Sequence, residues 1–156
     1  MNHGILLAAA LLLTGCATPY QREGATGGFS ETQYADNVFQ VTFKGNGFTA
    51  QEIAADYTLL RSAEVALEHG FAYFVVVDAQ RYSEYATYTT PRHTYASATA
   101  YGNTAYGSAT TYGGHTYLIA KPHSSNVIAC FKEKPEVFSF EARFLIQSLK
   151  QKYGLQ

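Results

Sequence analysis

Four of the five histidines in the sequence are the first residues to consider for metal chemistry, because imidazole nitrogens bind zinc and related ions. They are His69, His93, His115 and His123. Metal-binding histidines usually come in close pairs, such as i, i+4 on one helix, and these four show no such pairing. The spacing therefore predicts loop or surface positions and no metal site.

Cys130 and His123 could in principle form a nucleophile and its base. Ile128 and Phe131 flank Cys130, however, and a thiol in an apolar strand ionises poorly. We therefore expect Cys130 in the core. The sequence has no Gly-x-Ser-x-Gly motif, no Walker loop and no dinucleotide fingerprint in the right context. These observations predict a protein that is not an enzyme and holds no cofactor.

Arg61, Glu64 and Asp78 are the remaining polar residues near predicted core elements. Arg61 and Glu64 are three residues apart on a predicted helix, a spacing typical of a structural ion pair. The alternative is a pocket between sheet and helices, lined by all three side chains, in a periplasmic small-ligand binder or an envelope enzyme. The spacing favours the ion pair.

The charge balance is close to neutral, which bears on possible partners. The 156 residues have a net charge of −1 and a pI near 6.5. Nucleic-acid-binding proteins usually carry a basic patch, and nothing in this composition indicates one. We expect no nucleic-acid partner.

The N-terminal residues indicate secretion. Ile5 to Leu13 is an uninterrupted apolar run of nine residues, and a membrane span needs about 20. The run has the length of the apolar region of a signal peptide, although Met1-Asn2-His3 lacks the usual basic residue.

Leu13-Thr14-Gly15-Cys16 resembles the lipobox of bacterial lipoproteins. The resemblance implies a signal peptide over residues 1–15 and a diacylglyceryl thioether, with acyl chains such as palmitate, on Cys16. It also implies that Ala17 favours the periplasmic face of the outer membrane over the inner membrane. A disulfide between Cys16 and Cys130 is the alternative use of these thiols.

The mature chain is predicted to be one α+β domain behind a tether. Residues 16–28 are rich in glycine and poor in apolar residues, which is typical of a flexible tether. Residues 29–153 then contain the predicted domain. Its length is sufficient to bury a core without a disulfide or a metal ion.

Periodicity predicts the order β-β-α-β, insertion, β-β-α. A hairpin is expected over 29–34 and 38–44, with Phe39, Val41 and Phe43 on its buried face. The later elements are a helix over 49–69 that begins with a Thr49–Glu52 capping box, a central strand over 71–78, a second hairpin over 116–120 and 126–132, and a helix over 139–153 that begins at Ser139. Both helices should cover one face of a mostly antiparallel sheet.

Residues 81–115 form an insertion rich in Tyr, Thr, Ser, Ala and Gly. Within it, residues 95–101 match residues 106–112 at five of seven positions, and no charged residue occurs between Arg92 and Lys121. Two alternatives remain open, an outlying β-hairpin and a segment that stays disordered until it meets a partner. Tyrosine-rich, uncharged surfaces suit contact with an envelope protein or a glycan, here through residues 82–114. Self-association of such a segment is a third alternative.

The stretch from Tyr57 to Phe74 is similar to a segment in a family of small bacterial lipoproteins. The shared features are a Leu-x-Arg-x-Ala-Glu helix that leads through Gly70 into an aromatic strand, and a Ser/Thr/Tyr/Gly-rich insertion. The resemblance also includes residues 43–47 and 131–135 and so covers most of the mature chain. It implies the membrane anchor and the fold, and it implies no catalytic residue.

Overall fold

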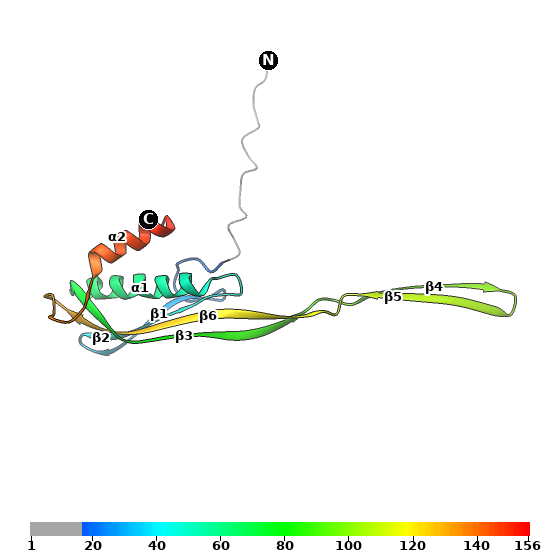
Figure 1. Cartoon of the computed structure of the whole chain (residues 1–156), viewed down its shortest axis with the longest axis horizontal. Helices are drawn as coiled ribbons and strands as arrows, with labels where there is room; N and C mark the ends of the chain where they lie inside the picture. Colours follow the sequence, from blue (N-terminus) through cyan, green and yellow to red (C-terminus); the bar gives the residue numbers. More distant parts are fainter. Residues whose placement is uncertain (1–16) are drawn as a thin grey trace, which may run out of the picture. The chain divides into compact units, whose positions relative to one another are not determined.

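The computed structural model describes residues 17–156 (Figure 1). These residues form two compact units, one made of residues 17–84 with 120–156 and the other of residues 85–119. The predicted signal peptide, 1–15, and Cys16 lie outside the described residues. The elements are β1 (Gly28–Ala35), β2 (Val38–Lys44), α1 (Gln51–Glu68), β3 (Tyr73–Thr89), β4 (His93–Tyr101), β5 (Thr104–Tyr112), β6 (Thr116–Phe131), β7 (Phe140–Glu141) and α2 (Ala142–Tyr153).

A five-stranded sheet in the order β1-β2-β6-β3-β7 is the frame of the first unit. The pairs β1–β2, β2–β6 and β3–β7 are antiparallel. The strands β4 and β5 form a separate two-stranded antiparallel sheet. The fold is therefore α+β with a mostly antiparallel sheet, as the sequence predicts.

The predicted hairpin of β1 and β2 is confirmed, and so is its buried face. Phe39, Val41 and Phe43 are all almost completely buried. Each alternates with a residue that points to the opposite face of the sheet, because side chains alternate along a strand. The apolar face packs against α1, where Phe43 meets Tyr57 with ring centroids 5.1 Å apart.

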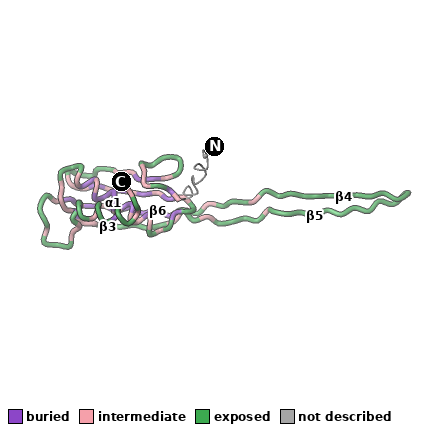
Figure 2. The backbone as a smooth tube through the Cα atoms, turned by 90° about the horizontal axis from the view of Figure 1, so that it is seen from above, coloured by how far each residue is buried: buried purple, intermediate pink, exposed green. Residues whose placement is uncertain are grey.

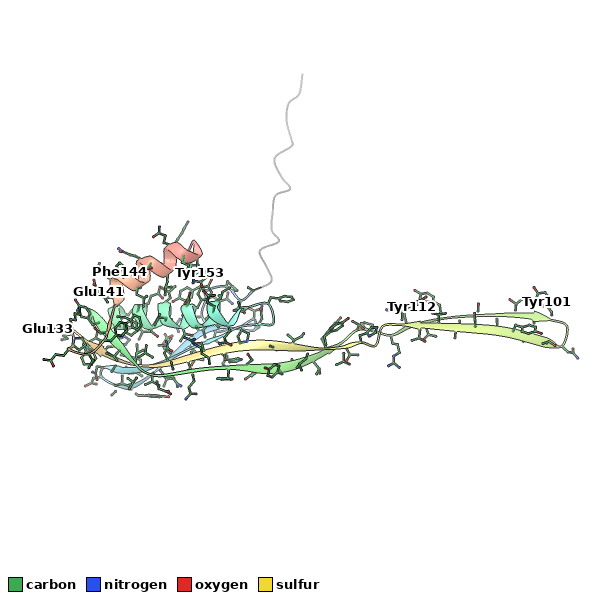
Figure 3. All side chains as sticks on the ribbon, viewed as in Figure 1. Tyr101, Tyr112, Glu133, Glu141, Phe144 and Tyr153 are labelled. Atoms are coloured by element: carbon green, nitrogen blue, oxygen red, sulfur yellow. The ribbon has the colours of Figure 1, made fainter. Side chains whose placement is uncertain are left out.

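Both helices lie on one side of the sheet (Figure 1). The helix α1 contacts β1 and β2 directly, and α2 packs on α1. Tyr153 near the end of α2, labelled in Figure 3, packs edge-on against Tyr57 of α1 at 5.1 Å. Because sheet and α2 enclose α1 from two sides, α1 is buried over most of its surface. Figure 2 shows buried residues concentrated in this unit.

The predicted start of each helix is wrong by a few residues. Ala50 is the N-cap of α1 and no side chain caps the helix, so the predicted capping box does not form. The Thr49 hydroxyl instead accepts hydrogen bonds from the Thr18 and Asn46 amides. The helix α2 begins at Ala142 and not at Ser139, since Phe140 and Glu141 first pair with β3. At the other end, Gly154 ends α2 in the left-handed conformation, with φ of 63°.

The predicted second hairpin is wrong, because residues 116–131 form one continuous strand. Pro122, His123 and Ser124 have the composition of a turn, yet they lie within β6, between β2 and β3. Residues 123–129 pair with β2 over its whole length. Pairing on both sides of β6 satisfies the backbone, so the polar composition does not produce a turn.

The strand β3 begins near its predicted position but is longer than predicted. It passes through Asp78, which we expected to end it, and continues to Thr89. Phe74 is fully buried, but Val77 is 64% exposed. The apolar run therefore packs on its helix side only, because neither of the two described helices, α1 and α2, covers the other face of the sheet.

Residues 17–28 pack against the domain, although the sequence predicts a flexible tether. The Thr18 hydroxyl accepts a hydrogen bond from the Asn46 amide and donates one to the Thr26 carbonyl, at 2.9 and 2.8 Å. Thr18 is only 2% exposed. A segment rich in glycine and threonine is usually flexible. Here the glycines let the backbone approach β2, and the Thr18 hydroxyl makes hydrogen bonds that hold the segment in place.

Gly27 allows this close approach, and its replacement is our first prediction. Its φ is 99°, and a Cβ atom there would lie 2.2 Å from the Lys44 carbonyl oxygen. We expect Gly27→Ala to reduce the free energy of unfolding by about 2–4 kcal/mol, from backbone strain and overpacking. Chemical denaturation of the purified chain measures this loss.

Gly24→Ala is the matched control in the same loop, because a Cβ at Gly24 meets no atom within 4 Å. Its effect should stay within about 0.5 kcal/mol. Equal stability of the two variants would contradict the packing of this segment on β2.

Candidate functional site

Arg61 is the centre of a buried ion-pair cluster that joins four parts of the first unit. Its guanidinium lies 3.0 Å from Glu31 of β1 and 3.3 and 2.7 Å from Glu64 and Glu68 of α1. Arg61 itself is only 5% exposed. The predicted Arg61–Glu64 ion pair is therefore present, but it is one contact of several.

Neighbouring groups complete the cluster. The Tyr20 hydroxyl donates a 2.5 Å hydrogen bond to Glu64, and the Arg61 guanidinium lies over the Phe29 ring at 4.8 Å. Lys150 of α2 is 3.6 Å from the other Glu64 oxygen. The cluster thus links the N-terminal segment, β1, α1 and α2, which indicates a structural role.

The pKa shifts agree with stable charge pairing. Burial by itself would lower the pKa of Arg61, but hydrogen bonds to Glu68 and Glu31 outweigh burial and keep that pKa above its ordinary value. Burial likewise pushes the pKa of Glu31 upward, yet the Arg61 hydrogen bond and charge hold it below 4.5. Burial, and then the bond to Glu64, raises the pKa of Tyr20. All three groups keep their ordinary charge states near neutral pH.

The structure does not bring Asp78 to Arg61 and Glu64. Asp78 is an exposed residue of β3 and accepts a hydrogen bond from Gln80. Arg61 contacts β1, and both β2 and β6 lie between β1 and β3. The pocket predicted from these three side chains is therefore absent from the described residues.

A different hollow lies between α1, β3 and β6, with a volume of about 230 Å³. Leu59 and Val76 supply apolar surface, while Asp56 is its only acidic residue. Asp56 already accepts hydrogen bonds from Lys152 and Tyr153, both at 2.7 Å. Its carboxylate is therefore committed to holding α2 on α1.

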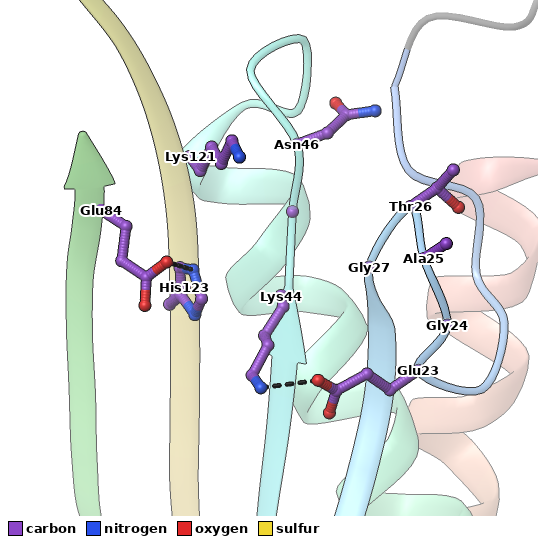
Figure 4. Close-up of a pocket in the computed structure, with 11 residues that line it drawn as sticks. Glu23, Gly24, Ala25, Thr26, Gly27, Lys44, Asn46, Glu84, Lys121 and His123 are labelled. Carbon is purple, nitrogen blue, oxygen red and sulfur yellow. Dashed lines mark hydrogen bonds and ion pairs between the residues drawn. The ribbon is translucent and has the colours of Figure 1, made fainter. Parts of the chain in front are cut away.

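A second hollow lies on the sheet face away from α1, and His123 is one of its lining residues (Figure 4). The register of β2 and β6 pairs Lys44 with His123, which places both on this face. Its volume is about 210 Å³. Its lining residues are Glu23, Gly24, Ala25, Thr26, Gly27, Lys44, Gly45, Asn46, Glu84, Lys121 and His123.

His123 is held on both sides in this hollow. Its Nε2 is 3.5 Å from a Glu84 oxygen, and its ring stacks on Tyr82 with centroids 5.0 Å apart. The Nδ1 atom is buried without a hydrogen-bond partner. Lys44 and Glu23 form an ion pair at 2.5 Å, which lowers the pKa of Glu23 and raises that of Lys44. Lys44 and Glu23 therefore satisfy each other's charge at the rim of this hollow.

No local sequence pattern indicates this arrangement, since residues 121–125 have the composition of a turn. His123 comes close to Glu84 and Tyr82 of β3 only because residues 121–125 lie in β6, which is the neighbour of β3 in the sheet. Cys130 is buried, as predicted, and burial raises the pKa of its thiol to about 12. His123 and Cys130 are seven residues apart on β6 and lie on opposite faces of the sheet.

The β4–β5 hairpin is the remaining candidate, and it shows which alternative for residues 81–115 applies. The two strands pair over nine positions and are joined by Gly102-Asn103, with Gly102 at φ of 58°. A two-residue turn with positive φ is typical of tight hairpins. Of the two predicted alternatives, the structure has the hairpin.

Every residue of β4 and β5 is exposed (Figure 2). Directly paired residues share a face, so the register gives the hairpin two unlike faces. One face, called here the tyrosine face, carries only tyrosine, serine, threonine and histidine: His93, Tyr95, Ser97, Thr99, Tyr101, Thr104, Tyr106, Ser108, Thr110 and Tyr112. Tyr101 and Tyr112 mark the ends of their strands in Figure 3. The other face carries small side chains: Thr94, Ala96, Ala98, Ala100, Ala105, Gly107, Ala109 and Thr111.

The tyrosine face is held by few contacts within the chain. Ser97 and Ser108 are hydrogen-bonded at 3.2 Å, and the Tyr95 and Tyr112 rings approach to 6.4 Å. The four tyrosines of the two repeats are each at least 62% exposed. This face is available to another molecule.

Other features of the described chain bear on its chemistry. Across residues 17–156, no set of three or more His, Cys, Asp or Glu side chains is arranged to bind a metal ion. Neither α1 nor α2 combines the length and the hydrophobicity that a membrane crossing requires.

No family model, curated protein or solved structure matches this chain. Its function is therefore inferred from its own residues.

Proposed function

We propose that this protein is a lipid-anchored component of the bacterial cell envelope that binds a partner protein through its β4–β5 hairpin. The anchor is the lipid on Cys16, and the outer membrane is the favoured location because of Ala17. The protein has no catalytic activity in this proposal.

The complete exposure of β4 and β5 is the observation that supports the proposal. A two-stranded hairpin is marginally stable in water unless a third strand or another surface covers it. This hairpin has nine paired positions and four exposed tyrosines, and it lacks charged residues. Tyrosines supply large, rigid contact area with a hydroxyl at its edge, which suits a protein interface.

Photo-cross-linking tests this proposal in intact cells. A photoreactive phenylalanine analogue in place of Tyr106 should give a discrete cross-linked product, because Tyr106 lies on the tyrosine face. The same analogue at Tyr34, which is comparably exposed on β1, is the matched control and should give none. Equal products at both positions would contradict a specific hairpin partner.

A shortened chain is the complementary variant. Thr89 and Thr116 have their hydroxyl oxygens 2.8 Å apart, so an Asn-Gly turn can join them once residues 90–115 are removed. This deletion keeps Tyr82 and Glu84 beside His123, unlike a deletion of residues 82–114. The shortened chain should fold normally and lose the partner. Retention of the partner by this variant would overturn the proposal.

A further inference from the structure

The two copies of the internal repeat pair with each other in β4 and β5. Ser97 faces Ser108, Tyr95 faces Thr110, and Thr99 faces Tyr106. The antiparallel arrangement places tyrosine opposite threonine on either side of the central serines. The hairpin therefore has an approximate two-fold axis through the Ser97–Ser108 pair, and the outer edge of β4 is chemically equivalent to that of β5.

Both outer edges are open. Within residues 17–156, β4 and β5 have only each other as strand neighbours. Natural edge strands are usually protected by lysine, proline or an inward-pointing charge. Between Arg92 and Lys121 this chain has no charged residue and no proline. Neither edge therefore carries a residue that would oppose the addition of another strand.

We propose that the hairpin's partner is a second copy of the same chain, which pairs edge to edge with the central serines opposite each other. The inference rests on the proposed function, since it names the partner of that same hairpin. A second copy offers the sequence that already pairs in this register within the hairpin. Serine would again face serine, and tyrosine would face threonine.

The absence of charge also favours a copy of this chain over an unrelated charged protein. Identical charged strands would repel each other when like charges stand opposite, and these strands contain none. Because the two edges are equivalent, each copy can accept a neighbour on either side. Assembly by this route extends an antiparallel sheet, with either β4–β4 and β5–β5 or β4–β5 contacts.

Cysteine cross-linking of the full-length chain in envelope membranes tests this pairing. Ser97→Cys places a thiol at the axis of a β4–β4 contact, and Ser108→Cys does the same for β5–β5. A mixture of the two variants reports β4–β5 contacts. Directly opposite residues have Cα atoms about 4.5–5.5 Å apart, within the range of a disulfide. We expect a disulfide-linked dimer from at least one of these three samples.

Thr99→Cys is the matched control on the same face of the same strand. In a β4–β4 contact its thiol would lie opposite Tyr95, and two such thiols would be about 13 Å apart along the strands. In a β4–β5 contact a whole strand would lie between the two thiols, which is about 9–10 Å. Both separations are too long for a disulfide. We expect at least tenfold less dimer from this variant. The parent chain controls for its own thiols, of which Cys130 is buried.

The results separate this inference from the proposed function. Equal dimer from Thr99→Cys and the serine variants would indicate random collision and overturn the pairing. No dimer from any serine sample, with a Tyr106 photoproduct that contains a different protein, would overturn the pairing and leave the proposed function. No dimer and no Tyr106 photoproduct would overturn both.

Discussion

Replacement of Arg61 by alanine is expected to lower the free energy of unfolding by about 3–5 kcal/mol. Arg61 pairs with Glu31, Glu64 and Glu68 from a site where it is only 5% exposed. Its loss would leave carboxylates close together without their shared cation. It would also remove the guanidinium from the Phe29 ring.

Arg22→Ala is the matched control, because Arg22 binds the same Glu31 carboxylate at 2.9 Å from a side chain that is 73% exposed. Exposed ion pairs contribute about 1 kcal/mol or less. Urea denaturation of both variants gives the comparison. If Arg61→Ala cost no more than Arg22→Ala, the cluster would not be a stabilising link between the N-terminal segment and the helices.

Replacement of Cys16 by alanine is expected to abolish incorporation of radiolabelled palmitate and to release the protein from the membrane fraction. The lipobox resemblance implies that the Cys16 thiol accepts the lipid in the proposed function. Single-chain anchoring is already weak and reversible, so removal of every acyl chain should leave little membrane affinity. Labelling followed by membrane fractionation measures both effects.

Cys130→Ser is the control, because Cys130 is the other cysteine of the sequence and its thiol is buried in β6. This variant should keep its label and its place in the membrane fraction. Label that persists in Cys16→Ala would contradict lipidation at this residue.

Alternating and helical periodicity predicted the fold class well, because burial of one face imposes a regular pattern on the sequence. Phe39, Val41 and Phe43 show this for β2. The pattern fails where long-range pairing supplies the stabilisation. His123 and Ser124 have the composition of a turn, yet neighbours on both sides hold them in a central strand.

The same difference between local and long-range contacts explains which parts of the candidate sites could be predicted. The Arg61–Glu64 pair was visible in the sequence because it is local to one helix. Glu31 and Tyr20 join it from 30 and 44 residues away, and no local pattern indicates such contacts. For the hairpin, the repeat predicted the strands, but only the register shows that the two copies face each other through Ser97 and Ser108.

The docking of Thr18 determines how much freedom a lipid on Cys16 would leave the domain. Two residues span at most about 7 Å of extended chain, whereas a free tether of 12 residues could reach about 40 Å. A domain anchored through Cys16 would diffuse within a thin layer at the bilayer surface. Encounters between copies would then take place in two dimensions, at a far higher local concentration than the same number of molecules would have in the periplasmic volume.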